Sequence, residues 1–308
     1  MRHKRKLCYI LLLITIILST PISVYASEPI NFQHYIFDTD DLRLSNLQGE
    51  LLLDYFEPRK DNLKTETILH TPTINPQNIR YIHTLAYDYD AMGNILLFDF
   101  KEYEKGITLN RGKTYLFNYN DHQQLTAYSL IEQSTRWGNP VTYDSSYVFS
   151  YNANGQMNTS NYVRNIGKGN ASYSYNSLNQ LTSIQVNDVG HCFQKEYYYD
   201  AIGNCIEYRG ELFQNFYTYN EAKQIIMLRA ITFLENGSTL SDNTYYFNYD
   251  TYGNISAISV VSLYTKMPTR TYNITIQNQY DSLNRLIARN VVNSGSGFTT
   301  TYVYEYID

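Results

Sequence analysis

Four aspartates recur in equivalent positions and are the residues of this chain best suited to chemistry. They are Asp90, Asp200, Asp250 and Asp281, and each directly follows a tyrosine. Carboxylates in this number could act as general acids and bases or as calcium ligands. Each is also followed, three residues later, by glycine or asparagine. A turn in which the carboxylate accepts backbone N–H bonds explains all four copies at once and is the favoured interpretation.

The sequence shows no spacing typical of a metal centre or of an activated nucleophile. The histidines are scattered over separate segments, as His34, His70, His83, His122 and His191. The stretch Asp38-Thr-Asp40-Asp41 differs from a calcium loop, because Leu42 occupies the next ligand position and no glycine follows at the bend. Metalloprotease pairs, nucleophile elbows and phosphate loops are also missing from the sequence. We therefore predict no catalytic, cofactor-binding or metal-binding residues, no cofactor and no enzymatic activity.

Aromatic side chains are the remaining candidates for ligand binding. Tyrosine accounts for 33 of the 308 residues, and rows of exposed rings could stack on sugars. Their regular alternation favours core packing instead. The single tryptophan lies outside the rows, in the turn Arg136-Trp137-Gly138-Asn139-Pro140, and Tyr143 follows it. Because a loop tryptophan can bind a ligand or fold back over the sheet, Trp137 and Tyr143 are speculative ligand-binding residues.

The aspartates belong to a phrase that occurs eight times, and a ninth copy begins at Tyr304. In each copy an aromatic strand ends in Tyr-Asp or Tyr-Asn, a turn follows, and an apolar residue restarts the chain. Successive phrase tyrosines are 20 to 32 residues apart, which indicates stacked supersecondary units. The repeat-defining residues are Tyr89, Asp90, Gly93, Tyr119, Tyr151, Gly155, Tyr175, Tyr199, Asp200, Gly203, Tyr219, Tyr249, Asp250, Gly253, Tyr280 and Asp281.

Each phrase predicts a β-hairpin. Alternation such as Tyr115-x-Phe117-x-Tyr119 puts three rings on one face of a strand and polar residues on the other. Glycine in the turn supplies the positive φ of a tight return, and Asn179 and Asn284 are the next best tolerated residues there. Because turn glycines alternate with other residues from copy to copy, the larger unit could be a pair of hairpins. The predicted fold class is all-β, an array of antiparallel β-hairpins in an open or partly spiralled sheet.

Three segments are predicted along the chain. Residues 1–26 are typical of a signal peptide, with four basic residues before an apolar run and small residues near Ala26. The apolar run is about 12 residues long, and a spanning helix needs ~20, so we expect no membrane span after cleavage; an uncleaved anchor is the alternative. Residues 27–84 lack the phrase and are predicted to form an irregular N-terminal cap, and residues 85–308 form the hairpin array.

The net charge of the chain limits the classes of partner that it is expected to bind. The chain has 24 basic and 29 acidic residues, and cleavage of the signal would leave 20 basic against 29 acidic, a formal charge of −9. Nucleic acid and anionic membrane surfaces are therefore excluded as expected partners.

Cys192 and Cys205 flank one phrase on strands whose turn does not place them opposite each other. An exported chain permits a disulfide, so their oxidation state stays open.

At the phrase residues the chain resembles the YD-repeat family, also called RHS repeats. The matching segments include Tyr89-Asp90-Ala-Met-Gly93-Asn94-Ile95 and Tyr280-Asp281-Ser-Leu-Asn284-Arg285-Leu286. The resemblance covers residues 85–308 and implies a strip of β-hairpins that spirals into a shell, as in bacterial polymorphic toxins, insecticidal toxin complexes and teneurin ectodomains. Eight or nine units are few for such a shell, and no Asp-Pro-x-Gly self-cleavage segment is present. The resemblance therefore favours the fold and a cell-surface setting over a toxin role.

The sequence thus predicts an exported bacterial YD-repeat protein, secreted or at the cell surface or envelope. Its expected role is that of a structural and binding module without enzymatic activity, with a carbohydrate or a protein as surface ligand. The alternative is an orphan shell segment or accessory component of an RHS-type toxin-delivery system, or a partner that associates edge to edge with another such chain. A secreted hydrolase ranks lowest, because no acid–base or nucleophile constellation is evident.

Overall fold

The computed structural model describes residues 63–72, 81–104, 108–134, 141–164, 167–188, 191–265, 267–295 and 298–306. The predicted signal peptide, Trp137 and the acidic stretch at Asp38 lie outside these residues. The described residues form two compact units. Unit 1 contains Ala171–Ile274, and unit 2 contains Arg59–Asn170 and Thr275–Asp308.

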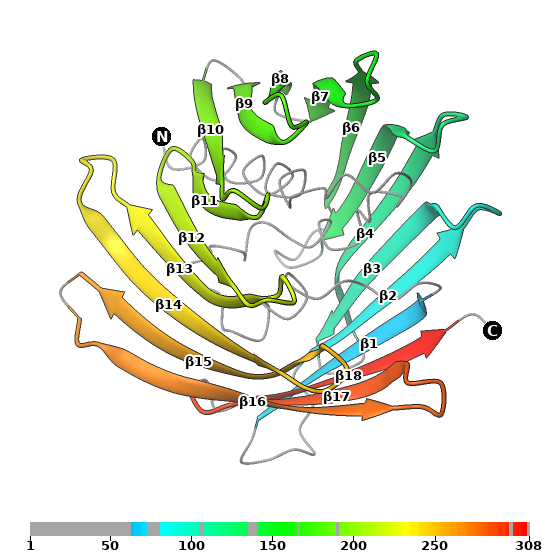
Figure 1. The fold of residues 1–308 in the computed structure, drawn as a ribbon. Coiled ribbons are helices and arrows are strands. Elements are labelled where there is room, and N and C mark those ends of the chain that lie inside the picture. The colour runs from blue at the N-terminus through cyan, green and yellow to red at the C-terminus, as the bar shows by residue number, and fades with distance from the viewer. Residues whose placement is uncertain are drawn as a thin grey trace. The chain divides into compact units, whose positions relative to one another are not determined.

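All regular elements of the described residues are β-strands, which confirms the all-β prediction (Figure 1). In chain order they are β1 (Leu63–Pro72), β2 (Tyr81–Tyr89), β3 (Ile95–Glu104), β4 (Thr108–Tyr119), β5 (Leu125–Ser134), β6 (Val141–Tyr151), β7 (Met157–Arg164), β8 (Gly167–Tyr175), β9 (Leu181–Asp188), β10 (His191–Tyr199), β11 (Cys205–Arg209), β12 (Phe213–Tyr219), β13 (Ile225–Phe233), β14 (Thr239–Tyr249), β15 (Ile255–Tyr264), β16 (Arg270–Tyr280), β17 (Leu286–Asn293) and β18 (Phe298–Tyr306).

The strand order contradicts the predicted open or partly spiralled sheet. Consecutive strands pair in antiparallel fashion, and β1 pairs with both β2 and β18. Leu69 of β1, for example, lies opposite Ile82 on one side and Thr301 on the other. The 18 strands therefore form one sheet whose order closes on itself. Closure satisfies the backbone groups that an edge strand would leave unpaired.

Strand β1, which closes the strand order by pairing with both β2 and β18, comes from a segment that lacks the phrase. β1 lies within residues 27–84, where the sequence predicted an irregular cap. Its first residue, Leu63, accepts a hydrogen bond of 2.8 Å from the phenol of Tyr89. Leu125 accepts the same bond from Tyr151, at 2.7 Å. Leu63 thus occupies the position of the apolar residue that restarts the chain after a phrase turn.

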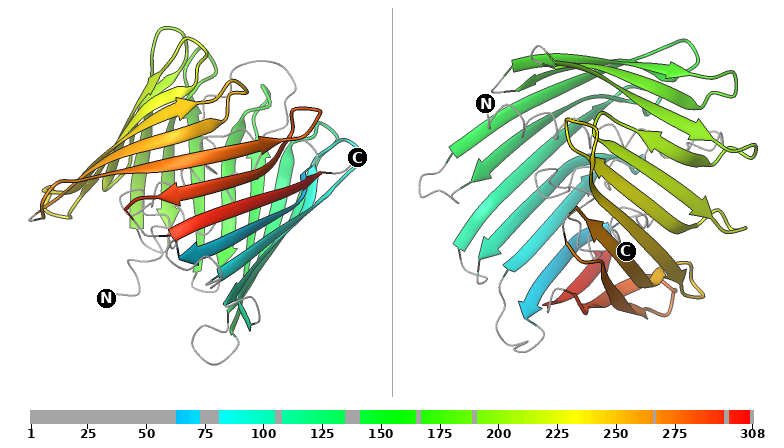
Figure 2. Two further views of the ribbon diagram at one scale, coloured as in Figure 1. Left: turned by 90° about the horizontal axis from the view of Figure 1, so that it is seen from below. Right: turned by 90° about the vertical axis from the view of Figure 1, so that its left-hand side faces the viewer.

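Strands such as β14 bury one face and expose the other, as period-two alternation predicts. In β14 the side chains of Tyr245 and Phe247 are buried, and those of Tyr246 and Asn248 are exposed. Figure 2 shows neighbouring strands of each unit running side by side in alternating directions. The core therefore lies on one face of the sheet, and the opposite face is available for contacts.

Buried aromatic rings form a continuous row across unit 2. Adjacent centroids are 5.0, 5.6, 6.2, 4.4 and 5.6 Å apart, in or next to the ~4.5–7 Å range of favourable ring pairing. The rings belong to Tyr87, Phe98, Tyr115, Tyr128, Tyr147 and Tyr162. These rings pack in the core, so they do not form an exposed platform for sugars.

Candidate functional site

The repeated aspartates and asparagines hold the phrase turns. Asp90 Oδ1 accepts hydrogen bonds of 2.8 Å from the N–H groups of both Met92 and Asn94, and Oδ2 accepts one of 2.9 Å from the Asn94 side chain. Asp200 makes the equivalent contacts with Ile202 and Asn204. Partial burial would by itself raise the Asp200 pKa, but these hydrogen bonds stabilise the carboxylate and lower it overall. The contacts match the turn interpretation and engage both oxygens of each carboxylate.

Every phrase turn also contains one residue with a left-handed backbone. Glycine occupies this position in four turns, and Asn179 and Asn284 occupy it in two, as the sequence predicted. Gln123 and Lys223 fill it in the remaining two, with φ of 60° and 61°. In each case this residue ends a three-residue loop and donates its N–H to the carbonyl of the Asp or Asn.

The phrase tyrosines tie each hairpin to the one before it. Six phenols donate to a backbone carbonyl at 2.7–2.8 Å. In five of the pairs the acceptor is the residue that restarts the chain after the preceding turn, and Tyr89 donates to Leu63, the first residue of β1. The pairs are Tyr89 with Leu63, Tyr151 with Leu125, Tyr199 with Leu181, Tyr219 with Cys205, Tyr249 with Ile225, and Tyr306 with Leu286. The phrase residues therefore perform folding tasks, and a ligand site must use other side chains.

Of the two speculative ligand-binding residues, only Tyr143 is described. It lies in β6 opposite Glu132, on the same face of the strand as buried Tyr147 and Phe149, but its own side chain is 46% accessible. Glu132 accepts hydrogen bonds from Arg111 at 2.8 and 2.5 Å. An exposed ring therefore lies across the strand pair from an ion pair.

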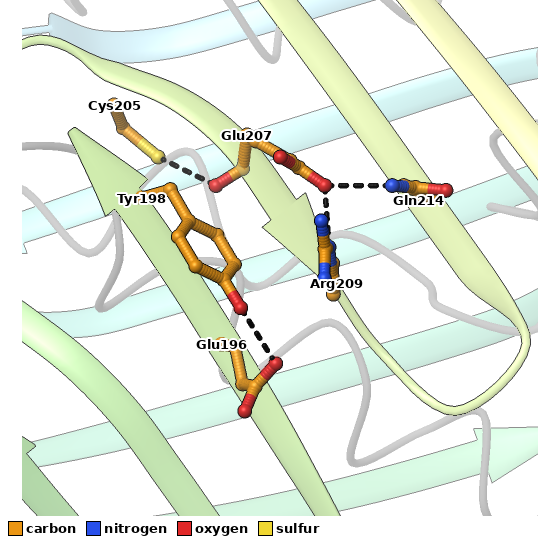
Figure 3. Close-up of polar contacts among 6 residues, drawn as sticks. All are labelled: Glu196, Tyr198, Cys205, Glu207, Arg209 and Gln214. Atoms are coloured by element: carbon orange, nitrogen blue, oxygen red, sulfur yellow. Dashed lines mark hydrogen bonds and ion pairs between the residues drawn. The ribbon is translucent and has the colours of Figure 1, made fainter. Parts of the chain in front are cut away.

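A more elaborate group of exposed and half-buried polar side chains lies on β10, β11 and β12 in unit 1 (Figure 3). The register places Tyr198 opposite Glu207 and Glu196 opposite Arg209. The Tyr198 phenol donates to Glu196 at 3.0 Å, and Glu207 accepts from Arg209 at 2.5 Å and from Gln214 at 2.6 Å. We call Glu196, Tyr198, Glu207, Arg209 and Gln214 the polar cluster.

The polar cluster holds one aromatic ring between charged groups. The Arg209 guanidinium lies 4.8 Å from the centroid of the Tyr198 ring, which is the geometry of a cation–π contact. Tyr198 remains 38% accessible. Its hydrogen bond to Glu196 and its partial desolvation raise the pKa of the phenol. Arg209 and Gln214 hold the pKa of Glu207 below its usual value, although burial alone would raise it.

The cysteines are separate thiols. Cys192 is exposed and donates to Asn187 Oδ1 at 2.9 Å, and Cys205 is buried and lies opposite Tyr199. The strand register thus confirms that the two are not opposite each other. Burial raises the pKa of Cys205 to about 11, so its thiol is protonated at neutral pH and is a poor nucleophile.

The histidines lie in separate surroundings. His83 is 3.3 Å from Glu102, and His191 is 3.0 Å from Glu211. Within the described ranges, no three His, Cys, Asp or Glu side chains are grouped closely enough to hold a metal ion. The described part of the chain also contains no helix with the length and apolar character to cross a bilayer.

The polar cluster was not predicted from the sequence. Period two places Glu196 and Tyr198 on one face of β10, and that part of the pattern is visible in the sequence. Its partners come from β11 and β12, and a one-residue change of register would move them to the other face. Whether these side chains meet therefore depends on the register of β11 against β10 and of β12 against β11, across two turns of different lengths.

Comparisons with known proteins concern the fold. No protein-family model and no curated protein matches the chain. Among solved structures, the crystal structure of TcdB2-TccC3-Cdc42 is similar with 16% identity and a TM-score of 0.36, over 73% of this chain and 13% of that chain. A porin-like protein from Bacteroides uniformis is similar with 12% identity and a TM-score of 0.42, over 81% of this chain and 98% of that one. A porin-like protein from Bacteroides vulgatus gives 9% identity and 0.33, over 80% and 99%.

Proposed function

We propose that this chain is an exported bacterial YD-repeat protein that serves, without catalysis, as a structural and binding module at the cell envelope. The YD-repeat assignment is supported by the tasks of the phrase residues, since Asp90 caps its turn, Gly93 adopts positive φ and Tyr89 ties neighbouring hairpins. Export is supported by the basic and apolar pattern of residues 1–26. The function then depends on the exposed face of the sheet.

The polar cluster is the main support for a binding role. An exposed Tyr198 ring can pack against the apolar face of a sugar, and flanking carboxylate, amide and guanidinium groups can bond its hydroxyls. The internal hydrogen bonds of Glu207 with Arg209 and Gln214 hold these groups in place before a ligand arrives. Such preorganisation lowers the entropy lost on binding. The ligand class we propose is therefore a carbohydrate.

The electrostatics of the cluster favour binding over hydrolysis. A glycosidase needs one carboxyl group that is protonated near neutral pH, which requires a raised pKa. Glu207 has a lowered pKa because Arg209 and Gln214 stabilise its charged form. Glu196 accepts hydrogen bonds from Tyr198 and from Gln194, at 3.0 and 3.2 Å. Both carboxylates are thus arranged as hydrogen-bond acceptors.

Retention of the full chain on insoluble cell-wall glycan tests this proposal. Tyr198→Ala should reduce retention at least about tenfold, because it removes the ring and the support for Arg209. Tyr246→Ala is the matched control, since Tyr246 is an exposed tyrosine of β14 outside the cluster. Trp137→Ala tests the surface predicted from the sequence in the same assay. Equal retention of wild type and Tyr198→Ala would refute the role of the cluster.

A further inference from the structure

One position of the phrase turn carries large apolar side chains that are more than half exposed. It is the residue two after the Asp or Asn, whose backbone N–H donates to the capping oxygen in Leu178, Ile202 and Tyr252 of unit 1. Their side chains are 68, 72 and 54% accessible. Met92 and Leu283 occupy the same position in unit 2 and are 64 and 70% accessible. We call the three side chains of unit 1 the apolar tips.

The apolar tips lie at one end of the strands of unit 1. Each phrase turn joins an even-numbered strand to the odd-numbered strand after it, and the strands pair in sequence (Figure 1). The turns that carry Leu178, Ile202 and Tyr252, with the turn of Ala222 between the last two, therefore follow one another along the same end of the sheet. Neighbouring turns are two strands apart, which corresponds to about 10 Å.

This spacing suits a penetrable surface better than a protein partner. A stable protein interface buries about 800 Å² on each side as a continuous patch. Single apolar side chains about 10 Å (Leu178 to Ile202) and about 20 Å (Ile202 to Tyr252) apart, with polar turn residues between them, do not supply such a patch. Each tip can enter the interfacial region of a bilayer independently, and tyrosine is favoured at that depth because its ring is apolar and its hydroxyl stays hydrated.

The charge of the turns in unit 1 determines which lipid headgroups they can approach. The four turns of unit 1 contain Asp200, Glu221 and Asp250 against Lys223, a net charge of −2. An anionic lipid surface would be repelled, and so would a second copy of the same row. A zwitterionic surface carries no net charge, and the cationic end of a phosphatidylcholine headgroup is compatible with the turn carboxylates. We propose that the apolar tips dock unit 1 on a zwitterionic lipid surface.

The chain itself supplies conservative test substitutions. His122 and Asn154 of unit 2 occupy the same turn position, and their N–H groups make the same bond to the capping side chain. A polar residue at this position is therefore compatible with the turn. The test variant is Leu178→Asn, Ile202→Asn and Tyr252→His combined. Met267→Asn is the control, because Met267 is exposed and follows β15, at the other end of the strands.

Flotation of the full chain with phosphatidylcholine vesicles tests the proposal. Wild type and Met267→Asn should float, and the triple variant should bind at least about tenfold more weakly, since three apolar side chains no longer enter the bilayer. Tyr198→Ala should float like wild type, which separates this proposal from the carbohydrate site. No flotation of wild type, equal flotation of the triple variant, or flotation only with phosphatidylglycerol vesicles would overturn it.

A second measurement covers the case in which the triple variant does not fold. Leu178→Trp places a fluorophore at an apolar tip, and Asn154→Trp places one at the same turn position in unit 2. Brominated phosphatidylcholine should quench the first and leave the second unchanged, after subtraction of the Trp137 signal of the wild type. Equal quenching of the two variants would contradict docking through the tips of unit 1.

Discussion

The side-chain amide of Gln124 donates a hydrogen bond of 3.0 Å to the backbone carbonyl of Gly155, so the turn of one hairpin is joined to the turn of the next. Gln180 contacts Gly203 at 3.4 Å and Gln224 contacts Gly253 at 3.3 Å in the same way. These contacts account for glycine in three of the four glycine turns, and Gly93 has no such neighbour. A Cβ atom at Gly155 would lie 3.2 Å from the Gln124 amide nitrogen. The second turn of each pair therefore favours glycine for two reasons, its φ and this close approach.

The first prediction separates those two reasons. Gly155 and Gly93 both have positive φ, but only Gly155 has a glutamine against it. Replacement of either by alanine should cost about 1–2 kcal/mol of unfolding free energy through backbone strain. Gly155→Ala should cost a further ~0.5–1.5 kcal/mol by disturbing the Gln124 hydrogen bond. Urea unfolding of both variants, each with and without Gln124→Ala, measures the difference. Equal costs at Gly93 and Gly155 would contradict the role of the glutamine.

The second prediction concerns the two turns in which a less suitable residue has a left-handed backbone. Lys223 has a φ of 61°. This backbone conformation is unfavourable for lysine, because its Cβ atom comes too close to a backbone carbonyl oxygen, and glycine has no Cβ atom. Lys223→Gly should therefore stabilise the protein by about 1 kcal/mol. Asn284→Gly should change stability less, because asparagine tolerates the same φ. Thermal unfolding of the two variants compares them, and a destabilised Lys223→Gly would show that the side chain makes a compensating contact.

The hairpins could be predicted from the sequence because their determinants are local. Positive φ at Gly93 and Asn179, the capping by Asp90 and the burial of Tyr115 all depend on residues within a few positions of one another. Closure of the strand order is different, because it depends on β1 pairing with β18, about 240 residues later. The sequence did contain one clue. Asn62-Leu63 matches Asn94-Ile95 and Asn254-Ile255, the end of a phrase turn.

The third prediction follows from the charged turn caps. Asp281 has a pKa below the ordinary 3.8, chiefly because Arg285 donates to it at 2.7 Å, and the Asp200 pKa is also lowered. A lowered folded-state pKa contributes stability that is present above the ordinary pKa and is lost as the pH falls below it. Asn152 and Asn176 cap their turns without a charge. Asp200→Asn should therefore fold and should lose less stability than wild type between roughly pH 5 and 2.

Urea unfolding at a series of pH values measures this difference. Asp242→Asn serves as a control, since Asp242 pairs with Arg229 on the exposed face of β13 and β14 and caps no turn. An acid transition of Asp200→Asn that coincides with that of wild type would show that the turn carboxylate does not contribute to acid unfolding.

The fourth prediction concerns alkaline pH. The Tyr306 phenol donates to the Leu286 carbonyl at 2.8 Å, and burial raises its pKa to about 12. A raised pKa of a neutral acid gives stability that is present below the ordinary value of 10 and decreases as the pH rises from 10 towards 12. Tyr306→Phe should lose about 1 kcal/mol at neutral pH, with the hydrogen bond, and should lose less stability above pH ~10. Tyr246→Phe, at an exposed position, should match wild type in both ranges.

The last prediction uses two glycines of unit 2 for which the same substitution should have opposite effects. A Cβ atom at Gly169 would lie 1.9 Å from the Tyr162 hydroxyl oxygen, and Tyr162 is buried beneath the Arg164 guanidinium, 4.5 Å from its centroid. Gly169→Ala must displace this ring and should cost about 1–3 kcal/mol.

At Gly112 the nearest atom is the Phe100 carbonyl oxygen at 3.8 Å, which is an ordinary contact, and φ is not positive. Gly112→Ala should therefore stabilise the protein by about 0.4–1 kcal/mol, because alanine loses less backbone entropy on folding. Chemical unfolding of Gly169→Ala and Gly112→Ala measures whether the unfolding free energy falls in the first and rises in the second. Tyr162→Leu combined with Gly169→Ala tests the cause, since the smaller side chain makes room for the new methyl group. If the double variant were no more stable than the sum of the single costs implies, the close approach of Tyr162 to Gly169 would not be the reason for glycine at this position.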